Sequence, residues 1–338
     1  MADRWIDAHA HLPLPPDARS TELLERWQLA GVVNICVSHG SLGGLHAQRA
    51  WYRTLHDRHP DRFAWVTSFP LEGFGRRGWA DEVCRQLDAD LDAGAVGVKV
   101  WKNVGMELRD PDTGDWVFVD DERFDPVFRH LQGRGAAVLT HIGEPLAAWL
   151  PLDPANPHYG YYSQATQWHW HGRRDVPTHA RLIASRDALL ERYPELPLVG
   201  LHLGSQEHDL DAVAERLRRY PQYRVDTGGR LGDLAVHAAR DPGRLKAFFD
   251  EFAGRVFWGV DWVLTAEWAG LSEMRQSSLT QAIARQYDLE RQFLSGTESV
   301  QVGPTRTAGL GLPSSTLAVL CHDAAKAFYF RSSATPRA

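Results

Sequence analysis

Short apolar runs alternate with amphipathic stretches eight times along this chain, and that alternation constrains the fold more than any other feature. The apolar runs have the length of strands and cover residues 5–11, 32–38, 63–70, 95–101, 136–143, 197–204, 223–229 and 256–263. The amphipathic stretches have helical spacing and cover residues 22–29, 45–59, 79–93, 123–134, 180–193, 210–220, 243–252 and 315–330. Eight strand–helix units predict a parallel sheet that closes into a (β/α)₈ TIM barrel. We therefore predict an α/β fold with one barrel domain over residues 1–338.

The parity of residues within the predicted strands indicates which side chains point inward. Gly97, Lys99 and Trp101 alternate with valines, and Gly200 and His202 alternate with aliphatic residues in the same way. Because successive side chains of a strand point to opposite faces, each set shares one face. We expect the small and ionisable residues to face the crowded barrel axis, with Gly200 and Gly204 leaving room around His202. The aliphatic residues, Val199 among them, are expected to face the helices.

Three predicted connections are far longer than the usual two to six or so residues of a strand–helix loop. They cover residues 102–122, 144–178 and 264–312, after the fourth, fifth and eighth strands. All three follow the carboxyl ends of strands, where barrel enzymes build their active sites. The segment 144–178 is rich in aromatic residues and carries Arg173 and Arg174. It can be read as a lid over a pocket for a planar or acidic ligand, as a loop held by aromatic contacts, or as a subunit contact.

Composition excludes several classes of partner. The 338 residues include 37 Lys and Arg against 43 Asp and Glu, a net charge of −6, which argues against a nucleic-acid or anionic-membrane partner. Cys36, Cys84 and Cys321 are far apart and form no redox or metal motif. The amino terminus resembles no signal peptide, and no apolar stretch approaches the roughly 18 residues that span a membrane. We expect a cytoplasmic protein that acts on a small molecule, with a homodimer as an open alternative to a monomer.

Five metal-binding or catalytic side chains stand at the downstream ends of predicted strands: His9, His11, His141, His202 and Asp261. The two histidines of a His-x-His pair point to the same side of a strand, and by themselves they are a weak signal. A single buried histidine is more often a hydrogen-bonded core residue. Five such groups at strand ends indicate a metal site, and three imidazoles with one carboxylate suit Zn²⁺ better than Mg²⁺.

These positions resemble the motifs of a known superfamily. The segments Asp7-Ala-His9-Ala-His11, Thr140-His141-Ile-Gly-Glu-Pro, Gly200-Leu-His202-Leu-Gly and Gly259-Val-Asp261 look like those of the amidohydrolase superfamily. The most similar branch contains aminocarboxymuconate semialdehyde decarboxylase and the resorcylate decarboxylases. The resemblance spans nearly the whole chain, and it implies one divalent transition metal, Zn²⁺ first and Mn²⁺ as the alternative. It further implies that His9, His11, His141 and Asp261 hold this metal and that His202 lies beside the metal-bound water.

The shared motifs are specific for the superfamily but do not identify the substrate, because one barrel site supports many reactions. Lys99 stands where binuclear members of the superfamily carry a carbamylated lysine that bridges two metals. We favour a role as a cation for a substrate carboxylate, and assign Lys99, Trp101, Arg173 and Arg174 to substrate binding. Asp226 could orient a ligand, but a hydrogen bond at the end of its strand is the favoured interpretation. Asp7 and Glu144 are further candidates for supporting the ligands from behind.

The expected activity is hydrolysis of an ester, lactone or amide of a small carboxylate-bearing substrate by a metal-activated water. Asp261 would accept the proton of the water, and His202 would orient the nucleophile or stabilise developing charge. The alternative is a metal-dependent decarboxylase of a small aromatic or enol acid. The third hypothesis is a barrel without catalytic activity that serves as a binding protein. No phosphate loop, dinucleotide motif or serine nucleophile elbow occurs in the sequence.

Overall fold

The two ends of one parallel sheet are formed by the same short stretch of chain, and this closes the sheet into a barrel. The computed structural model describes residues 4–11, 25, 27, 29–35, 44–264 and 270–330. Within them, nine strands pair in the order β8-β7-β6-β5-β4-β3-β2-β1-β9. Strand β8 (Val256–Phe257) pairs with β7, and β9 (Trp262–Val263) pairs with β1, all in parallel. The predicted TIM barrel is therefore confirmed, with the last predicted strand divided in two.

The remaining barrel strands fall in or beside the predicted runs. They are β1 (Trp5–His11), β2 (Leu29–Ile35), β3 (Phe63–Ser68), β4 (Gly97–Val100), β5 (Ala137–Thr140), β6 (Leu198–Gly200) and β7 (Tyr223–Asp226). Strand β2 begins at Leu29, three residues before the predicted run. Most of the helix predicted over 22–29 lies outside the described residues, and so does the end of the second predicted run at 36–38.

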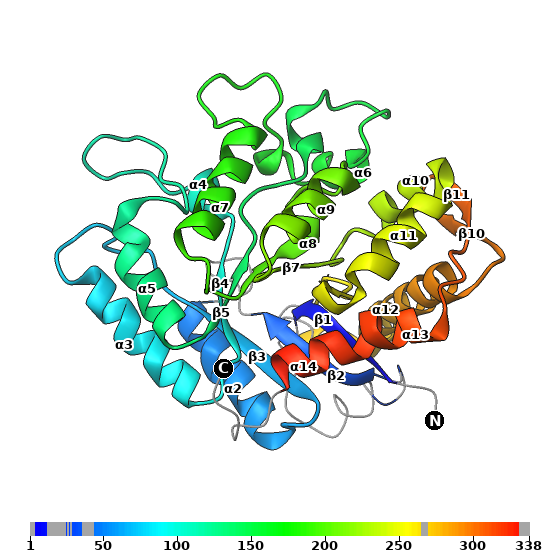
Figure 1. The fold of residues 1–338 in the computed structure, drawn as a ribbon, viewed down its shortest axis with the longest axis horizontal. Helices are drawn as coiled ribbons and strands as arrows, with labels where there is room; N and C mark the ends of the chain where they lie inside the picture. The colour runs from blue at the N-terminus through cyan, green and yellow to red at the C-terminus, as the bar shows by residue number, and fades with distance from the viewer. Residues whose placement is uncertain are drawn as a thin grey trace.

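Helices surround the strands, as Figure 1 shows. Seven predicted stretches correspond, within two residues at each end, to α2 (Leu45–Arg58), α3 (Trp79–Asp92), α5 (Asp125–Gly133), α7 (His179–Arg192), α9 (Leu210–Arg219), α11 (Pro242–Phe252) and the pair α13 (Ser314–Ala318) and α14 (Ala324–Tyr329). Helix α10 (Leu231–Arg240) was not predicted, although its buried residues Leu231, Leu234, Ala235 and Ala238 have clear helical spacing. None of the described helices has both the length and the apolar character needed to cross a membrane.

The three long connections differ in structure. Residues 102–122 contain the short, irregular α4 (Asn103–Met106), and residues 144–178 contain α6 (Tyr159–Tyr162) and two short 3₁₀ turns. In Figure 1 these two segments, teal to green, extend from the same end of the molecule. The connection 264–312 contains the long helix α12 (Glu273–Ser295) and a hairpin of β10 (Ser299–Val302) and β11 (Thr305–Ala308).

Strand pairing identifies the interior face of the barrel and corrects one prediction. Lys99 pairs with Leu139, and Leu139 pairs with Val199, so the three side chains lie on the same face. Lys99 lines the cavity described below, which makes this the interior face. The inward prediction for Lys99 is therefore confirmed, but the outward prediction for Val199 was wrong. Apolar residues fill this part of the barrel, among them Ala137, Leu139, Val199, Phe257, Phe328 and Tyr329.

Candidate active site

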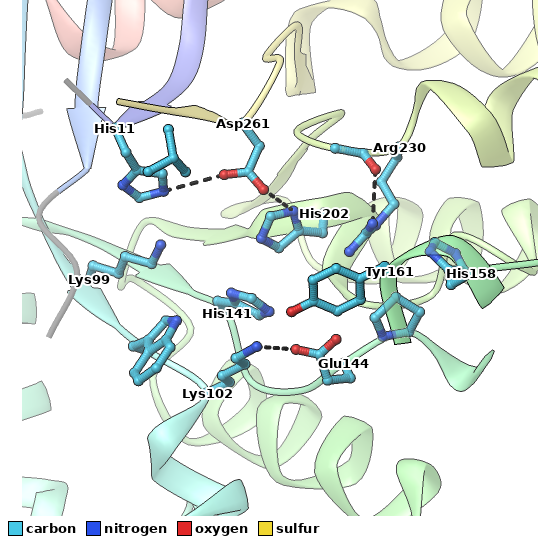
Figure 2. Close-up of a pocket in the computed structure, with 14 residues that line it drawn as sticks. His11, Lys99, Lys102, His141, Glu144, His158, Tyr161, His202, Arg230 and Asp261 are labelled. Carbon is cyan, nitrogen blue, oxygen red and sulfur yellow. Dashed lines mark hydrogen bonds and ion pairs between the residues drawn. The ribbon is translucent and has the colours of Figure 1, made fainter. Parts of the chain in front are cut away.

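A cavity of about 530 Å³ opens at the carboxyl ends of the barrel strands. Its walls include most of the predicted site residues together with several unpredicted ones: His11, Lys99, Trp101, Lys102, His141, Glu144, Pro145, His158, Tyr161, His202, Gly229, Arg230, Asp261 and Val263. Figure 2 shows His141 and His202 in the middle of this group, with Lys99 and Arg230 on opposite sides of them. His9 is fully buried beside the cavity.

Asp261, in the last predicted strand, contacts both histidines of the first strand, β1. One of its carboxylate oxygens, Oδ1, lies 3.1 Å from His9 Nε2 and 3.3 Å from His11 Nε2. Asp261 interrupts the chain between β8 and β9 with a left-handed backbone, φ 61°. Its N–H donates a 2.6 Å hydrogen bond to the carbonyl oxygen of His9. The break in the last predicted strand therefore aims this carboxylate at the two imidazoles.

His202 reaches the cavity through a turn and not through strand alternation. Strand β6 ends at Gly200, and His202 follows in the left-handed region with φ 59°. The expectation that Gly200 and Gly204 make room for His202 was wrong. A Cβ at Gly200 would lie 2.0 Å from the Tyr223 hydroxyl, and one at Gly204 would lie 2.3 Å from it. The two glycines therefore make room for Tyr223, while the turn itself directs His202.

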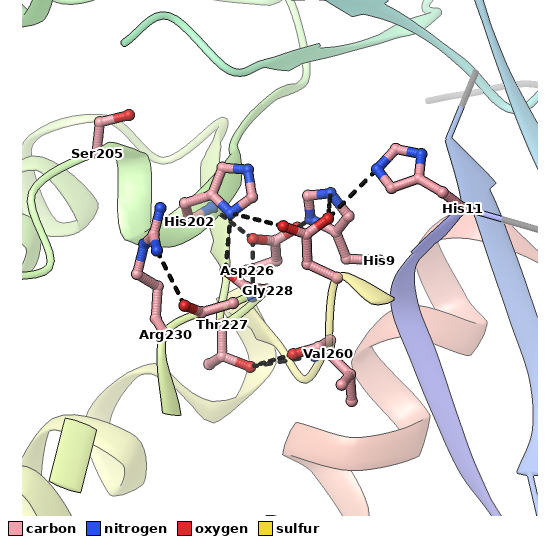
Figure 3. A network of polar contacts seen from close by, with 12 residues as sticks. His9, His11, His202, Ser205, Asp226, Thr227, Gly228, Arg230 and Val260 are labelled. Carbon is pink, nitrogen blue, oxygen red and sulfur yellow. Dashed lines mark hydrogen bonds and ion pairs between the residues drawn. The ribbon is translucent and has the colours of Figure 1, made fainter. Parts of the chain in front are cut away.

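Asp226 fixes two of the histidines by hydrogen bonds, and Figure 3 shows it between them. Its Oδ2 accepts a 2.7 Å hydrogen bond from His9 Nδ1, and its Oδ1 accepts a 2.6 Å bond from the backbone N–H of His202. With Nδ1 of His9 engaged, Nε2 is the nitrogen that remains for a ligand. A carboxylate behind an imidazole in this way is typical of metal-binding histidines. The sequence had suggested Asp226 only as a candidate for orienting a ligand.

The buried ring nitrogens fit a metal ion. His141 Nε2 is buried and has no hydrogen-bond partner among the described residues, whereas buried polar atoms are nearly always paired. His9 Nε2 is also buried and makes no hydrogen bond in the described part of the chain, although it lies 3.1 Å from Asp261 Oδ1. One nitrogen of His9, one of His202 and one oxygen of Asp261 lie within 4.8 Å of one another. Imidazole nitrogens with one carboxylate are the donors that Zn²⁺ prefers and that Mn²⁺ accepts.

Burial determines the protonation state of three of the four histidines, and neighbouring carboxylates determine that of His9. It lowers the pKa of His11 to about 4, that of His202 to about 3, and that of His141 well below its usual range. These rings are therefore neutral near pH 7, the form in which imidazole binds metals. Burial also lowers the pKa of His9, but the carboxylates of Asp261 and Asp226 outweigh it and raise the value to about 9.

The predicted substrate residues divide into two groups. Lys99 and Trp101 line the cavity. Arg173 and Arg174 are exposed and do not line it, and Arg173 lies near Asp175 and the ring of Trp170. The loop that carries these arginines turns them toward solvent, so the substrate-binding role predicted for them has no support in the structure.

Arg230, which the sequence did not single out, lies in the cavity wall just after β7. Its side chain is buried, and it donates a 2.9 Å hydrogen bond to the carbonyl oxygen of Gly229. Its Nε lies 3.8 Å from Glu207 Oε2, and neither atom has a hydrogen-bond partner in the described part of the chain. The sequence did offer one indication that Arg230 lies at the site: it directly follows the Gly228-Gly229 pair that ends the seventh predicted strand.

The aromatic connection 144–178 contributes part of the cavity wall through Pro145, His158 and Tyr161. Lys102 forms a buried ion pair with Glu144, which also accepts a 2.9 Å hydrogen bond from the hydroxyl of Tyr162. The Lys102 ammonium lies 3.8 Å from the ring centre of Trp168. His158 contacts Asp233 of α10 at 3.0 Å. These contacts hold the connection against the barrel as a wall over the cavity.

Comparison with known proteins places the chain in a family. The family model described as amidohydrolase matches residues 6–330. No curated protein matches the chain in sequence. Among solved structures, a putative 2-pyrone-4,6-dicarboxylic acid hydrolase from Pseudomonas putida is similar, with a TM-score of 0.54, 15% identity and 97% of each chain covered.

Two further structures share the fold at low identity. The 5-carboxyvanillate decarboxylase from Novosphingobium aromaticivorans, with bound manganese, has a TM-score of 0.51 and 13% identity over 94% of this chain and 82% of that one. The D-hydantoinase from Thermus sp. has a TM-score of 0.51 and 15% identity over 96% of this chain and 70% of that one. The fold is therefore shared with a putative hydrolase, a hydantoinase and a decarboxylase. Because the family model covers nearly the whole barrel, the chain belongs to the amidohydrolase family, whose members are metal-dependent enzymes.

Proposed function

We propose that this protein is a metal-dependent hydrolase that cleaves an ester, lactone or amide bond in a small carboxylate-bearing substrate. The observation that carries the proposal is that His9 and His11 meet the Asp261 carboxylate, with His141 in the wall of the same cavity and its buried Nε2 without a hydrogen-bond partner among the described residues. These four residues would hold one Zn²⁺ or Mn²⁺. When bound there, such an ion lowers the pKa of a water molecule and polarises a substrate oxygen.

The residues of the chain supply the proton transfers. The pKa of Asp261 lies well below its usual range: burial would raise it, and nearby His9, His11 and His202 outweigh burial. Asp261 is therefore ionised at neutral pH, the form in which a carboxylate holds a metal ion, and we assign it the role of proton acceptor on its position beside the histidines. His202 Nδ1 donates a 2.7 Å hydrogen bond to the carbonyl oxygen of Gly228, which fixes the tautomer and leaves Nε2 as an acceptor. In this proposal His202 orients the attacking water or stabilises the charge that develops on the substrate.

Arg230 is our candidate for binding the substrate carboxylate. A guanidinium group has five N–H donors in a planar fork that matches a carboxylate. The hydrogen bond to Gly229 uses one of them, and the buried Nε donates no hydrogen bond within the described residues, although Glu207 Oε2 lies 3.8 Å away. Lys102 is a weaker candidate because Glu144 neutralises it. We assign Lys99 to the opposite side of the same substrate and Trp101 to a flat wall against it.

Non-oxidative decarboxylation is the second candidate, favoured by the shared fold of the 5-carboxyvanillate decarboxylase with bound manganese. The same cavity would then hold an aromatic or enol acid, and carbon dioxide would leave. The residues at the strand ends serve both reactions and do not separate them.

A parallel assay separates the two reactions. Protein loaded with Zn²⁺ or with Mn²⁺ is supplied with a panel of carboxylated lactones, esters and hydroxybenzoates, and acid release and carbon dioxide release are recorded together. We expect the wild-type protein to release acid from a lactone or ester. His141→Ala, which lacks a metal ligand, should have no activity. Carbon dioxide release alone would replace hydrolysis with decarboxylation. No reaction and no bound metal in the wild-type protein would revive the binding-protein reading.

A further inference from the structure

Asp7 is a buried carboxylate behind the proposed metal ligands, and it is not part of the cavity wall. Four groups donate hydrogen bonds to it. Oδ1 accepts the backbone N–H groups of His9 at 2.9 Å and Val260 at 3.0 Å. Oδ2 accepts the Trp262 indole N–H at 3.0 Å and the Tyr287 hydroxyl at 2.6 Å. Since both oxygens accept two hydrogen bonds, the group acts as an ionised carboxylate.

Three of the four donors to Asp7 belong to two of the segments that carry proposed metal ligands, those of His9 and Asp261. His9 is itself a proposed ligand, and Val260 and Trp262 are the chain neighbours of Asp261. Asp261 has a left-handed backbone, which costs an L-residue other than glycine about 1–2 kcal/mol. Such a conformation persists only where its surroundings determine it. Asp7 holds the residue on each side of Asp261, so it fixes the direction of the Asp261 carboxylate relative to His9.

The fourth donor connects the ligands to a distant part of the chain. Tyr287 lies on α12, within the long connection 264–312, and it also contacts the Trp262 indole. Its ring is buried against Trp27 at 5.4 Å and Trp258 at 5.7 Å between ring centres. No described residue of 270–312 lines the cavity, so α12 supports the site from behind.

We propose that Asp7 is a positioning residue that sets metal affinity by holding His9 and Asp261 in one fixed arrangement, with Tyr287 of α12 as its support. The inference rests on the proposed metal site. An amide in place of the carboxylate would turn an NH₂ group toward two donors, because only its oxygen accepts hydrogen bonds. Asp7→Asn therefore keeps the size of the side chain and breaks hydrogen bonds to at least one of the two segments that carry His9 and Asp261.

The test is a titration of Zn²⁺ into metal-stripped protein, with wild type, Asp7→Asn, Tyr287→Phe and Asp90→Asn compared. Asp90 is the matched control: it is buried and accepts hydrogen bonds from Arg49 and Thr67, which belong to neither ligand-bearing segment. We expect the dissociation constant to rise about 10- to 100-fold in Asp7→Asn, as when a partner behind a ligand is lost. Tyr287→Phe removes one hydroxyl and should weaken binding by about 3- to 10-fold. Asp90→Asn should bind Zn²⁺ within about twofold of the wild type.

Thermal unfolding of each variant with and without Zn²⁺ distinguishes positioning from general stability. A merely structural role would lower the melting temperature of Asp7→Asn and leave the rise on adding Zn²⁺ unchanged. Positioning predicts that this rise shrinks, because it depends on the affinity for the metal. Wild-type affinity in both Asp7→Asn and Tyr287→Phe overturns the inference and leaves the metal site intact. If Asp7→Asn does not fold, Tyr287→Phe decides. A wild-type protein that binds no Zn²⁺ or Mn²⁺ instead overturns the proposed function.

Discussion

Two residues of the site, His202 and Asp261, have left-handed backbones although neither is glycine. Each conformation costs about 1–2 kcal/mol, so the surrounding hydrogen bonds must compensate for it. The N–H of His202 donates to Asp226, and the N–H of Asp261 donates to the His9 carbonyl oxygen. The sequence predicted which residue types would meet here, but not these turns, because the contacts that hold them join residues far apart in the chain.

The role of His202 can be tested without disturbing its turn. Asparagine tolerates the left-handed region better than most residues, so His202→Asn should preserve the backbone. We expect turnover to fall by about 10²–10⁴, the range for losing a positioned proton-transfer or charge-stabilising group. Metal content, measured by elemental analysis, should stay near that of the wild type. Wild-type turnover in this variant would show that His202 only packs the barrel.

Substitution of Arg230 tests how the substrate is bound. Arg230→Met removes the guanidinium fork and should raise KM by about 10- to 100-fold, the loss expected for a charge-assisted hydrogen-bonded pair, with a smaller change in kcat. Arg230→Lys should recover part of the loss, because it restores the charge without the fork. The control is Arg173→Met, since Arg173 is exposed and outside the cavity wall. Equal effects of Arg230→Met and Arg173→Met on KM would contradict the assignment.

Among the secondary-structure elements, helix α12 carries a buried acid, Glu290, that makes the stability of the protein depend on pH. Glu290 accepts hydrogen bonds from the Trp258 indole at 3.4 Å and from the Gln286 amide at 3.2 Å. Burial raises its pKa from 4.5 to about 8. Between these values the folded state holds the proton more tightly than the unfolded state does. The contribution of Glu290 to folding therefore decreases as pH rises from about 4.5 to 8, and it is smallest above pH 8.

Glu290→Gln removes this titration and keeps the shape of the side chain. We expect the free energy of unfolding of the wild type to fall, relative to the variant, by on the order of a few kcal/mol between pH 6 and pH 9. Denaturant titrations of both proteins at these two pH values measure the difference. Parallel pH dependence in the two proteins would show that Glu290 has the same pKa in the folded and unfolded states.

At the scale of the whole molecule, the sequence predicted the closed barrel because alternating strands and helices are a local pattern. Features that depend on contacts between distant segments were not predictable from it. Val199 faces inward because its pairing partners do, against the simple parity of the run. Arg230 enters the cavity beside Glu207, and Tyr287 reaches Asp7 across the barrel wall. Helix α10 is different, since its spacing was present in the sequence and was overlooked.

We propose that His9, His11, His141 and Asp261 form a site for one metal ion. The most direct measurement is elemental analysis of purified wild-type, His141→Ala and Lys99→Ala proteins, each referred to protein concentration. We expect about one equivalent of transition metal in the wild type and in Lys99→Ala, and a large loss in His141→Ala, which lacks a ligand. Two equivalents in the wild type, or equal metal loss in both variants, would contradict this proposal and make Lys99 a metal ligand.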